Sequence, residues 1–285
     1  MTASVIPQCS VDYKFSVCLV VTKNEDTEHF REALLSVIYQ TLKPSEILLV
    51  DNGGLTPRHY QIITSVGGEV EIRLIRIENI KTVGEARNIA LHTAQYPIIA
   101  LADPDDVNEA DRFIKLIPVL DYRIRMVGSQ MREFDQKKND RHILRRVPCD
   151  FTSIIRYSRF RSPVNNPTIC YFREDALEVG GYNSSLNFGE DYDLAMKFIW
   201  NGKVIHNIPM VTVNFRIGNR KRLLQKRRGI FLLKQELLLH RLFLMKKYIS
   251  FYDFIIIITI KILIRTLPRK LFEIFYIRIL RNHEQ

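Results

Sequence analysis

Apolar and polar positions along the first 110 residues alternate in a way that predicts strands and helices in turn. Residues 15–21 (FSVCLVV) form an apolar run rich in β-branched side chains, and residues 28–39 carry apolar side chains at helical spacing. The alternation continues with strands expected at 47–50, 69–77 and 98–101 and a helix expected at 83–93. This order predicts parallel strands joined by right-handed crossovers, which means an α/β fold with a mostly parallel, Rossmann-like central sheet flanked by helices.

Polar residues follow the apolar runs where the expected strands end. Thr22 follows the first strand, Asp51 the second, and Asp103, Asp105 and Asp106 the strand at 98–101. Parallel α/β sheets bind ligands at the carboxyl ends of their strands. Carboxylates on a tight turn suit Mg²⁺ or Mn²⁺, although Asp is also an ordinary turn former. Asp51 has two interpretations as well, since it either accepts a hydrogen bond from a ligand or shapes the turn that follows it.

The second half of the chain is less regular. Residues 121–169 show no clear period, and their charged stretch at 132–146 is interpreted as solvated surface. A strand is expected at 168–172, a helix at 191–201, and closing strands at 204–207 and 211–215. Glu190 and Asp191 precede or open that helix, so they either cap it or provide a general base for a hydroxyl substrate. Trp200, on the apolar stripe of the same helix, is expected in the core.

The formal net charge of +11, from 42 Lys and Arg against 31 Asp and Glu, is unevenly distributed. Residues 216–285 contain 17 of the basic side chains and 4 of the acidic ones, which gives this tail +13 and the rest of the chain −2. A nucleic-acid-binding protein is therefore disfavoured for the chain as a whole, and only the tail is basic enough to bind nucleic acid by itself. An apolar fraction of 46% excludes a disordered chain. The four Cys have no ligand-like spacing and fit a reducing cytosol rather than a disulfide scaffold or zinc module.

The basic tail also carries large apolar side chains. It is expected to form helices at about 220–247, 251–266 and 268–280, and no segment reaches the roughly 18–20 apolar residues that a transmembrane helix needs. Apolar anchors among Lys and Arg fit helices that lie in an anionic membrane interface. The alternative is that these helices pack on the preceding domain or on a partner subunit. The expected organisation is a flexible lead-in at 1–13 without a signal peptide, a domain at 14–216 with halves at 14–106 and 107–216, and the tail at 217–285.

Several motifs follow one another in a specific order along residues 15–230. They are FSVCLVVTKNE at 15–25, SVIYQTLKPSEILLVDNG at 36–53, GEARN at 84–88, LADPDD at 101–106, NPT at 166–168, FREDALEVGGY at 172–182 and FGEDYDLAMKFIWNG at 188–202. Together they resemble the family 2 inverting glycosyltransferases of the GT-A fold, of the type that builds bacterial capsule, exopolysaccharide and O-antigen. The resemblance implies a GT-A domain followed by the helical basic tail.

The resemblance also implies a set of residues for the nucleotide-sugar donor. The donor-binding residues would be Thr22, Asn24, Glu25, Asp51, Arg87 and Asp103. Among these, Asp51 would contact the base, and Arg87 would lie near the uracil and diphosphate. Asp105 would be the main ligand of a Mn²⁺ or Mg²⁺ ion, with Asp103 beside it.

The catalytic roles implied by the resemblance fall on the later motifs. Asp191 would be the general base that takes the proton from an acceptor hydroxyl, and Glu190 would help to place the acceptor. Arg216 or Arg228 would stabilise the leaving diphosphate. A single in-line displacement of this kind inverts the anomeric centre.

The implied function is transfer of one hexosyl or N-acetylhexosaminyl unit from a nucleotide-diphosphate sugar, a UDP-sugar first of all, to a lipid-linked saccharide acceptor. The enzyme is expected in the cytoplasm, peripherally associated with the inner face of the cell membrane through its tail. Processive members of the family carry a Q-x-x-R-W motif. Here Gly229 stands in place of its Trp, so processive synthesis is not expected. Two alternatives remain. One is a nucleotidyltransferase or pyrophosphorylase, for which a Gly-rich loop after the first strand would be expected; the other is an inactive membrane-binding adaptor.

Overall fold

The computed structural model describes residues 13–22, 25–52, 54–66, 68–77, 82–136, 138, 140, 143–217, 230–266 and 282–283. Its strands are β1 (Phe15–Val21), β2 (Glu46–Asn52), β3 (Glu71–Ile77), β4 (Ile98–Ala102), β5 (Val107–Asn108), β6 (Ile124–Phe134), β7 (Ile143–Arg145), β8 (Cys170–Phe172), β9 (Val204–Arg216) and β10 (Asn282–His283). Its α-helices are α1 (Thr27–Ile38), α2 (Pro57–Ser65), α3 (Val83–Thr93), α4 (Arg112–Leu116), α5 (Phe151–Ser158), α6 (Arg173–Glu178), α7 (Glu190–Trp200), α9 (Ile230–Met245) and α10 (Phe251–Thr266).

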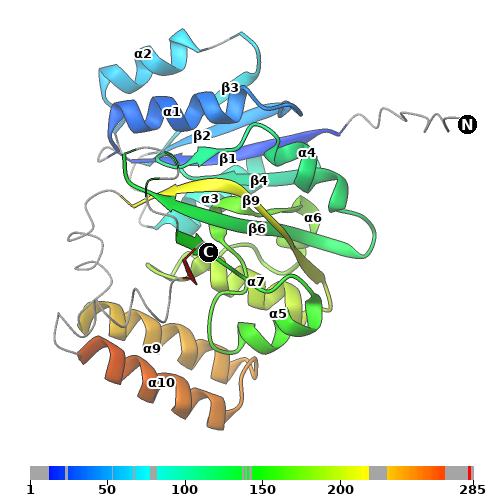
Figure 1. Ribbon diagram of the computed structural model, residues 1–285, viewed down its shortest axis with the longest axis vertical. Helices are drawn as coiled ribbons and strands as arrows, with labels where there is room; N and C mark the ends of the chain where they lie inside the picture. Colours follow the sequence, from blue (N-terminus) through cyan, green and yellow to red (C-terminus); the bar gives the residue numbers. More distant parts are fainter. Residues whose placement is uncertain are drawn as a thin grey trace, which may run out of the picture.

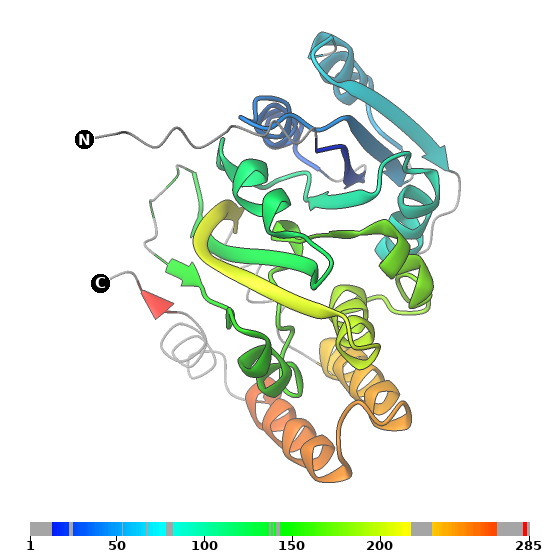
Figure 2. The same ribbon diagram turned by 90° about the vertical axis from the view of Figure 1, so that its right-hand side faces the viewer.

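The strands form one sheet in the order β10-β7-β6-β8-β4-β1-β2-β3, with β9 pairing to both β5 and β6 (Figure 1). The half made by β3, β2, β1 and β4 is parallel, as the sequence predicts. Beyond β4 the pairing is antiparallel except for the long parallel pair of β6 and β9, which Figure 2 shows side by side. The predicted α/β class is confirmed, and the parallel half brings the ends of β1, β2 and β4 to one edge.

Helices cover both faces of the sheet because successive strand residues point to opposite sides. Val17, Leu19 and Val21 of β1 join a cluster with α1, α2 and α4, whereas Cys18 joins a second cluster with α3, α5, α6 and α7. The second cluster holds α3 and α7 on one face of the sheet. The start of α7 is thereby brought close to the end of β4.

Side-chain caps set where several helices begin. The Asp26 carboxylate accepts from the backbone N–H groups of the first turn of α1, and Thr82 accepts from the N–H of Glu85 at the start of α3. Asp150 does the same for α5. Helix α7 differs, since its N-cap is Gly189 and no side chain caps it. Its first turn is instead acidic, which complements the helix dipole.

The second half of the sheet departs from its expected structure. Strands β6 and β7 and helix α5 occupy much of the stretch 121–169, for which irregular structure is expected. The polar residues of β6 are buried because neighbouring strands satisfy them: Ser129 and Thr212 share a hydrogen bond of 2.6 Å, and Arg145 donates to Glu133 at 2.6 Å. The interpretation of 132–146 as solvated surface is therefore wrong at Glu133 and Arg145. The two expected closing strands are one continuous strand, β9.

The expectation of a core position for Trp200 is also wrong. Its side chain is 52% exposed, and its ring stacks on that of Tyr248 with centroids 5.4 Å apart. Tyr248 lies in the turn between α9 and α10. The contact therefore joins the end of α7 to the two tail helices.

Helices α9 and α10 pack on the sheet-containing part of the molecule, at the end away from α2 in both views (Figures 1 and 2). The Tyr192 ring of α7 meets the Phe243 ring of α9 with centroids 4.9 Å apart, and Ile257 of α10 joins the same apolar cluster. Buried Glu236 of α9 accepts from Lys261 of α10 at 2.7 Å. Within the described residues no helix is long and apolar enough to cross a membrane. The expected helix at 268–280 lies outside the described residues, as do residues 1–12 of the lead-in.

Candidate active site

Three segments meet at the carboxyl edge of the parallel strands: the turn after β4, the start of α3 and the start of α7. Arg87 of α3 connects the other two. Its guanidinium donates to Glu190 at 2.6 Å and lies 3.5 Å from the Asp103 carboxylate. Burial opposes the charge on Arg87, but Glu190, Tyr182, Asp103 and Asp191 outweigh that effect and raise its pKa. The guanidinium is therefore held as a cation between the two acidic motifs.

Two glycines allow these segments to approach one another. A Cβ on Gly84 would lie 3.1 Å from the Asn183 carbonyl oxygen and 3.4 Å from Cβ of Glu190. Gly189 has a φ of +77°, in the left-handed region that other residues rarely adopt, and a Cβ there would lie 2.6 Å from Leu239 Cδ2 of α9. The glycine of GEARN and the glycine of FGED thus serve the approach of α3 and α9 to the start of α7.

The turn at Gly181-Tyr182 is tied to both helices. Asn88 of α3 accepts from the Tyr182 N–H at 2.8 Å and donates to the Tyr182 carbonyl at 2.8 Å. From α7, Lys197 donates to the Gly181 carbonyl at 2.7 Å and forms an ion pair with Asp193 at 2.9 Å. These contacts place the Tyr182 ring against Arg87, 5.6 Å from the guanidinium carbon. The sequence pattern alone predicts no role for Asn88 or Asp193, although the GEARN motif and the i, i+4 spacing of Asp193 and Lys197 are visible signals.

The turn after β4 concentrates negative charge. Burial raises the pKa of Asp105 to about 7, and the charges of Asp103 and Glu25 add to the effect. Burial likewise raises the pKa of Asp103, where Glu190 adds to the effect against the opposing charge of Arg87. Asp106 points inward: its Oδ1 accepts from the Arg216 N–H at 2.8 Å, while its Oδ2 is buried without a hydrogen-bond partner.

The donor set on this turn fits a hard divalent cation. Asp103 and Asp105 are partly exposed carboxylates whose charged forms are disfavoured by burial and by nearby negative charge, and a cation bound to them would offset that cost. In the part of the chain that is described, no group of three or more His, Cys, Asp or Glu side chains is arranged to hold a metal ion. Two carboxylates are nevertheless enough for Mg²⁺, which usually keeps waters and takes further oxygens from phosphates.

Asp191 lies in the first turn of α7, next to the Arg87–Glu190 pair. Burial raises its pKa to about 7, with a further contribution from the charge of Glu190 and an opposing one from Arg87. A carboxylate with a pKa near neutrality is well matched to accept a proton at physiological pH. The sequence-predicted pair Glu190 and Asp191 therefore occupies two different environments, one bound to Arg87 and one facing a cavity.

The residues expected to bind the donor lie at the ends of β1 and β2. The Thr22 hydroxyl donates to Glu25 at 3.0 Å. Asp51 accepts from the N–H groups of Gly54 and Leu55 and from the Tyr60 hydroxyl at 3.1 Å, so it shapes the turn after β2. Asp51 also lies at the carboxyl edge of the sheet, and its contact with the base stays a prediction. Asn24 lies outside the described residues.

Arg216 ends β9 directly behind the acidic turn. Its side chain donates to the Asp105 carbonyl at 2.9 Å, pairs with Glu32 of α1, and lies over the Phe134 ring at 4.4 Å. The guanidinium is thus engaged with protein groups and supports the backbone of the turn. Arg228, the other arginine expected at the diphosphate, lies outside the described residues.

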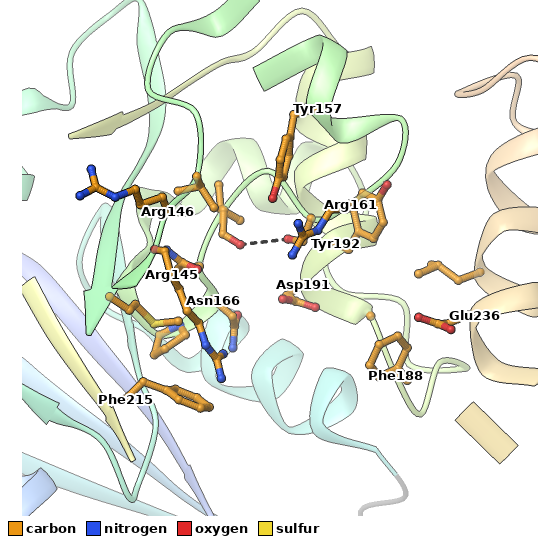
Figure 3. A pocket seen from close by; sticks show the side chains of 18 of the residues that line it. Arg145, Arg146, Tyr157, Arg161, Asn166, Phe188, Asp191, Tyr192, Phe215 and Glu236 are labelled. Atoms are coloured by element: carbon orange, nitrogen blue, oxygen red, sulfur yellow. Dashed lines mark hydrogen bonds between the residues drawn. The ribbon is translucent and has the colours of Figure 1, made fainter. Parts of the chain in front are cut away.

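A cavity of about 560 Å³ opens beside Asp191 (Figure 3). Asp103 and Asp191 belong to its wall, together with residues of β6, β7, α5, the loop before β8, α7, α9 and α10. Figure 3 shows Asp191 between Asn166 on one side and Glu236 of α9 on the other. The cavity therefore offers space for a molecule that reaches Asp191 from the second half of the domain.

The chain is similar to bacterial glycosyltransferases over nearly its whole length. A galactosyltransferase of Escherichia coli, UDP-Gal:alpha-D-GlcNAc-diphosphoundecaprenol beta-1,3-galactosyltransferase, is 30% identical over 271 residues, which cover 94% of this chain and 97% of that relative. The amylovoran biosynthesis glycosyltransferase AmsE of Erwinia amylovora is 27% identical over 264 residues, 92% of this chain and 97% of AmsE.

Solved structures show the fold. TarS of S. aureus in complex with UDP-GlcNAc has a TM-score of 0.58 at 18% identity, covering 92% of this chain and 70% of that one. The mannosyltransferase PcManGT of Pyrobaculum calidifontis in complex with GDP-Man and Mn²⁺ has a TM-score of 0.60 at 16% identity, covering 79% and 63%. The predicted GT-A fold is thereby confirmed.

Residues 17–181 match the sequence profile described as Glycosyl transferase family 2. The chain belongs to glycosyl transferase family 2.

Proposed function

We propose that this protein is an inverting glycosyltransferase that moves a single sugar from a UDP-sugar to a hydroxyl of a lipid-linked saccharide during surface polysaccharide synthesis. The observation that carries the proposal is the Arg87 bridge, which brings the acidic turn after β4 and the carboxylates at the start of α7 to one place. The E. coli relative, whose name gives a UDP-sugar donor and a polyprenol-linked acceptor, supports the substrate classes. Membership of the family favours this reading over a nucleotidyltransferase or an inactive adaptor.

Asp191 is the proposed general base. It faces the cavity, and its pKa near 7 lets the carboxylate accept a proton from an acceptor hydroxyl while remaining largely ionised above neutrality. The hydroxyl oxygen attacks the anomeric carbon as that proton leaves, and the bond from the anomeric carbon to the diphosphate breaks on the opposite face. Glu190 is bound to Arg87, so it positions the start of α7 rather than competing for the proton.

The donor side of the site follows from the strand ends. Thr22, Glu25 and Asp51 lie at the edge where nucleotides bind in parallel sheets, and Asn24 belongs to the same predicted set. Asp105 and Asp103 would hold Mg²⁺ or Mn²⁺, which when bound would neutralise charge on the diphosphate. The Mn²⁺ in the complex of the P. calidifontis mannosyltransferase supports a divalent cation as the occupant.

Arg216 and Arg228 remain the predicted partners of the leaving diphosphate. Because Arg216 is bound to the Asp105 backbone and to Glu32, its proposed contribution is to hold the acidic turn in place and add positive potential there. The alternative contact, between Arg228 and the diphosphate, stays a prediction from the sequence.

The test is a screen of nucleotide sugars with Mg²⁺ or Mn²⁺, in which release of nucleoside diphosphate is measured with a lipid-linked acceptor. Asp191→Asn should abolish transfer and leave UDP binding intact. Asp111→Asn, a surface carboxylate paired with Lys115, is the matched control and should transfer at the normal rate. Turnover near the wild-type rate in Asp191→Asn would show that another group is the base.

Membrane association is the second part of the proposal. The outer faces of α9 and α10 and the turn between them expose large apolar side chains: Ile230, Phe231, Leu237, Leu238, Met245, Phe251, Tyr252, Ile255, Ile260, Ile262 and Leu263. Lys246 and Lys247 lie in the turn. Exposed apolar side chains next to lysines fit the interface of an anionic membrane, so the protein would be held peripherally at the inner face of the cell membrane.

Point substitutions test this better than truncation, since α9 and α10 contribute Phe243 and Ile257 to a buried cluster. Phe251→Ser with Tyr252→Ser should reduce co-sedimentation with vesicles that contain anionic phospholipid. The control is Tyr122→Ser, because Tyr122 is 78% exposed, similar to Phe251 and Tyr252, but lies outside the tail helices. Unchanged binding of the double variant would exclude this surface as the membrane contact.

A further inference from the structure

The wall of the cavity beside Asp191 carries three arginines that the proposed chemistry does not use. Arg145 ends β7, Arg146 follows it, and Arg161 comes shortly after α5. All three come from the second half of the domain. Figure 3 shows Arg145 on the same side as Asn166 and Phe215, with Arg161 reaching in near Asp191.

Arg145 is rigidly placed and incompletely satisfied. Its Nε donates to Glu133 at 2.6 Å, and its guanidinium lies 3.7 Å from the centroid of the Phe215 ring. Its Nη2 is buried and has no hydrogen-bond partner. A buried guanidinium nitrogen without an acceptor is costly. An anionic oxygen entering the cavity would supply that acceptor.

Arg146 and Arg161 are exposed, and within the described ranges neither forms an ion pair with a carboxylate. Arg161 lies over the Tyr157 ring at 5.6 Å. Burial lowers the pKa of Lys261, and the charges of Arg265 and Arg161 add to that effect against the opposing charge of Glu236, so Arg161 and Lys261 repel each other across the cavity. A bound anion would relieve that repulsion. A planar guanidinium group can donate two parallel hydrogen bonds to two oxygens of one phosphate.

We propose that these arginines bind the phosphate groups through which the acceptor sugar is joined to its lipid. This inference rests on the proposed function. A phosphate of the donor is a less suitable occupant, because among the described donor-side residues only Asp103 belongs to the cavity wall, whereas Thr22, Glu25 and Asp51 do not. The diphosphate in the acceptor named for the E. coli relative is of the required chemistry.

The far side of the cavity fits the lipid that such a phosphate carries. The wall is completed by Leu239 and His240 of α9 and Lys261 of α10, and the same two helices hold the exposed apolar side chains described above. If the acceptor sugar lies at Asp191 and the phosphates lie at the arginines, the lipid tail of the acceptor can extend toward the proposed membrane contact.

The experiment measures binding, so that it does not depend on turnover. Undecyl diphosphate is titrated by calorimetry into the full chain with UDP and Mg²⁺ at saturation, which keeps the donor site filled, and undecyl glucoside serves as the neutral probe with the same chain. Arg146→Gln and Arg161→Gln should each weaken undecyl diphosphate binding by about tenfold, the loss of one charge-assisted hydrogen bond. Binding of undecyl glucoside and of UDP should not change.

Arg156→Gln is the matched control, since Arg156 is an exposed arginine of α5 that does not belong to the cavity wall. Undecyl diphosphate that fails to bind the wild-type protein, or binds all variants equally, would overturn the inference. Variants that weaken UDP binding by the same factor would assign the arginines to the donor and overturn it as well. Failure of the proposed function is distinguishable, because it shows as absent sugar transfer whatever the binding results are.

Discussion

Arg87 donates a hydrogen bond to Glu190 across 2.6 Å, and the two residues are 103 positions apart in the chain. The same guanidinium lies 3.5 Å from Asp103. One side chain of α3 thus fixes the distance between the acidic turn after β4 and the start of α7. Both side chains of the pair are largely buried, at 7% and 14% exposure.

Removing Arg87 should disturb both stability and catalysis. Arg87→Gln leaves Glu190 and Asp103 without their cation, and breaking a buried ion pair from one side costs about 3–5 kcal/mol. Transfer should fall by about a hundredfold or more, because the base and the donor site lose their relative position. Urea unfolding and steady-state kinetics measure the two effects.

The control for Arg87 is Arg58→Gln. The Arg58–Glu28 pair is solvent-exposed on both sides, so its loss should cost less than about 1 kcal/mol and leave the transfer rate unchanged. If Arg87→Gln were as mild as Arg58→Gln, the bridge would have no structural importance.

The pH dependence should report the environment of Asp191. Its pKa is raised to about 7 by burial and by the charge of Glu190. A base must be ionised to act, so kcat/KM should be highest above that pH and fall about tenfold per unit below it. Glu190→Gln removes the neighbouring negative charge and should move this acidic limb to lower pH. Profiles at saturating Mg²⁺, which keeps Asp105 ionised, test the shift, and a limb that stays in place or moves upward would contradict it.

Gly189 should not tolerate a side chain. Gly189→Ala forces a φ of +77° on alanine, which costs about 1–2 kcal/mol. It also places a methyl group 2.6 Å from Leu239 Cδ2. The start of α7 must then shift, so the transfer rate should fall in addition to the stability.

Gly202→Ala separates the two effects in Gly189→Ala. Gly202 has a similar φ of +71°, but a Cβ there meets nothing within 4 Å. It should show the backbone cost alone and normal kinetics. Adding Leu239→Ala to Gly189→Ala should recover part of the rate, and an absence of any recovery would show that the contact with α9 is not the cause.

Metal removal should act through the turn after β4. Without a cation, Asp105 and Asp103 repel each other and their pKa values are raised, so chelation should lower the affinity for UDP. Asp105→Asn should abolish the gain in UDP affinity that Mg²⁺ produces in the wild-type protein. Calorimetry with and without Mg²⁺ measures this gain, and a gain of normal size in the variant would move the metal site elsewhere.

Local sequence was sufficient for the parallel half of the sheet. The bounds predicted for the strand at 15–21 and the helix at 83–93 are those of the structure. The spacing of apolar side chains and the helix caps that set these bounds involve only residues close together in the chain. The positions of the acidic motifs at strand ends were predicted for the same reason. The separation of the +13 tail from the nearly neutral domain also needed only the order of residues.

The sequence could not reveal β6 or the wall of the cavity. Ser129 and Glu133 look like solvated residues, yet they are buried because Thr212 and Arg145 satisfy them from other strands. Polarity predicts exposure only when no partner is present, and partners distant in the chain are invisible to local pattern. Trp200 was misplaced for the same reason, since its partner Tyr248 belongs to the tail.

The sequence by itself determined the family, the fold class and the identity of the acidic motifs. Only the tertiary structure decided which of these groups is a bridge, which faces a cavity and which supports a turn. Arg87 became the connection between two motifs, and Asp191 the carboxylate beside the arginine-lined cavity. The physical reason is that pairing and burial of charges depend on distances between elements, which packing of the sheet and helices sets and local residue pattern does not.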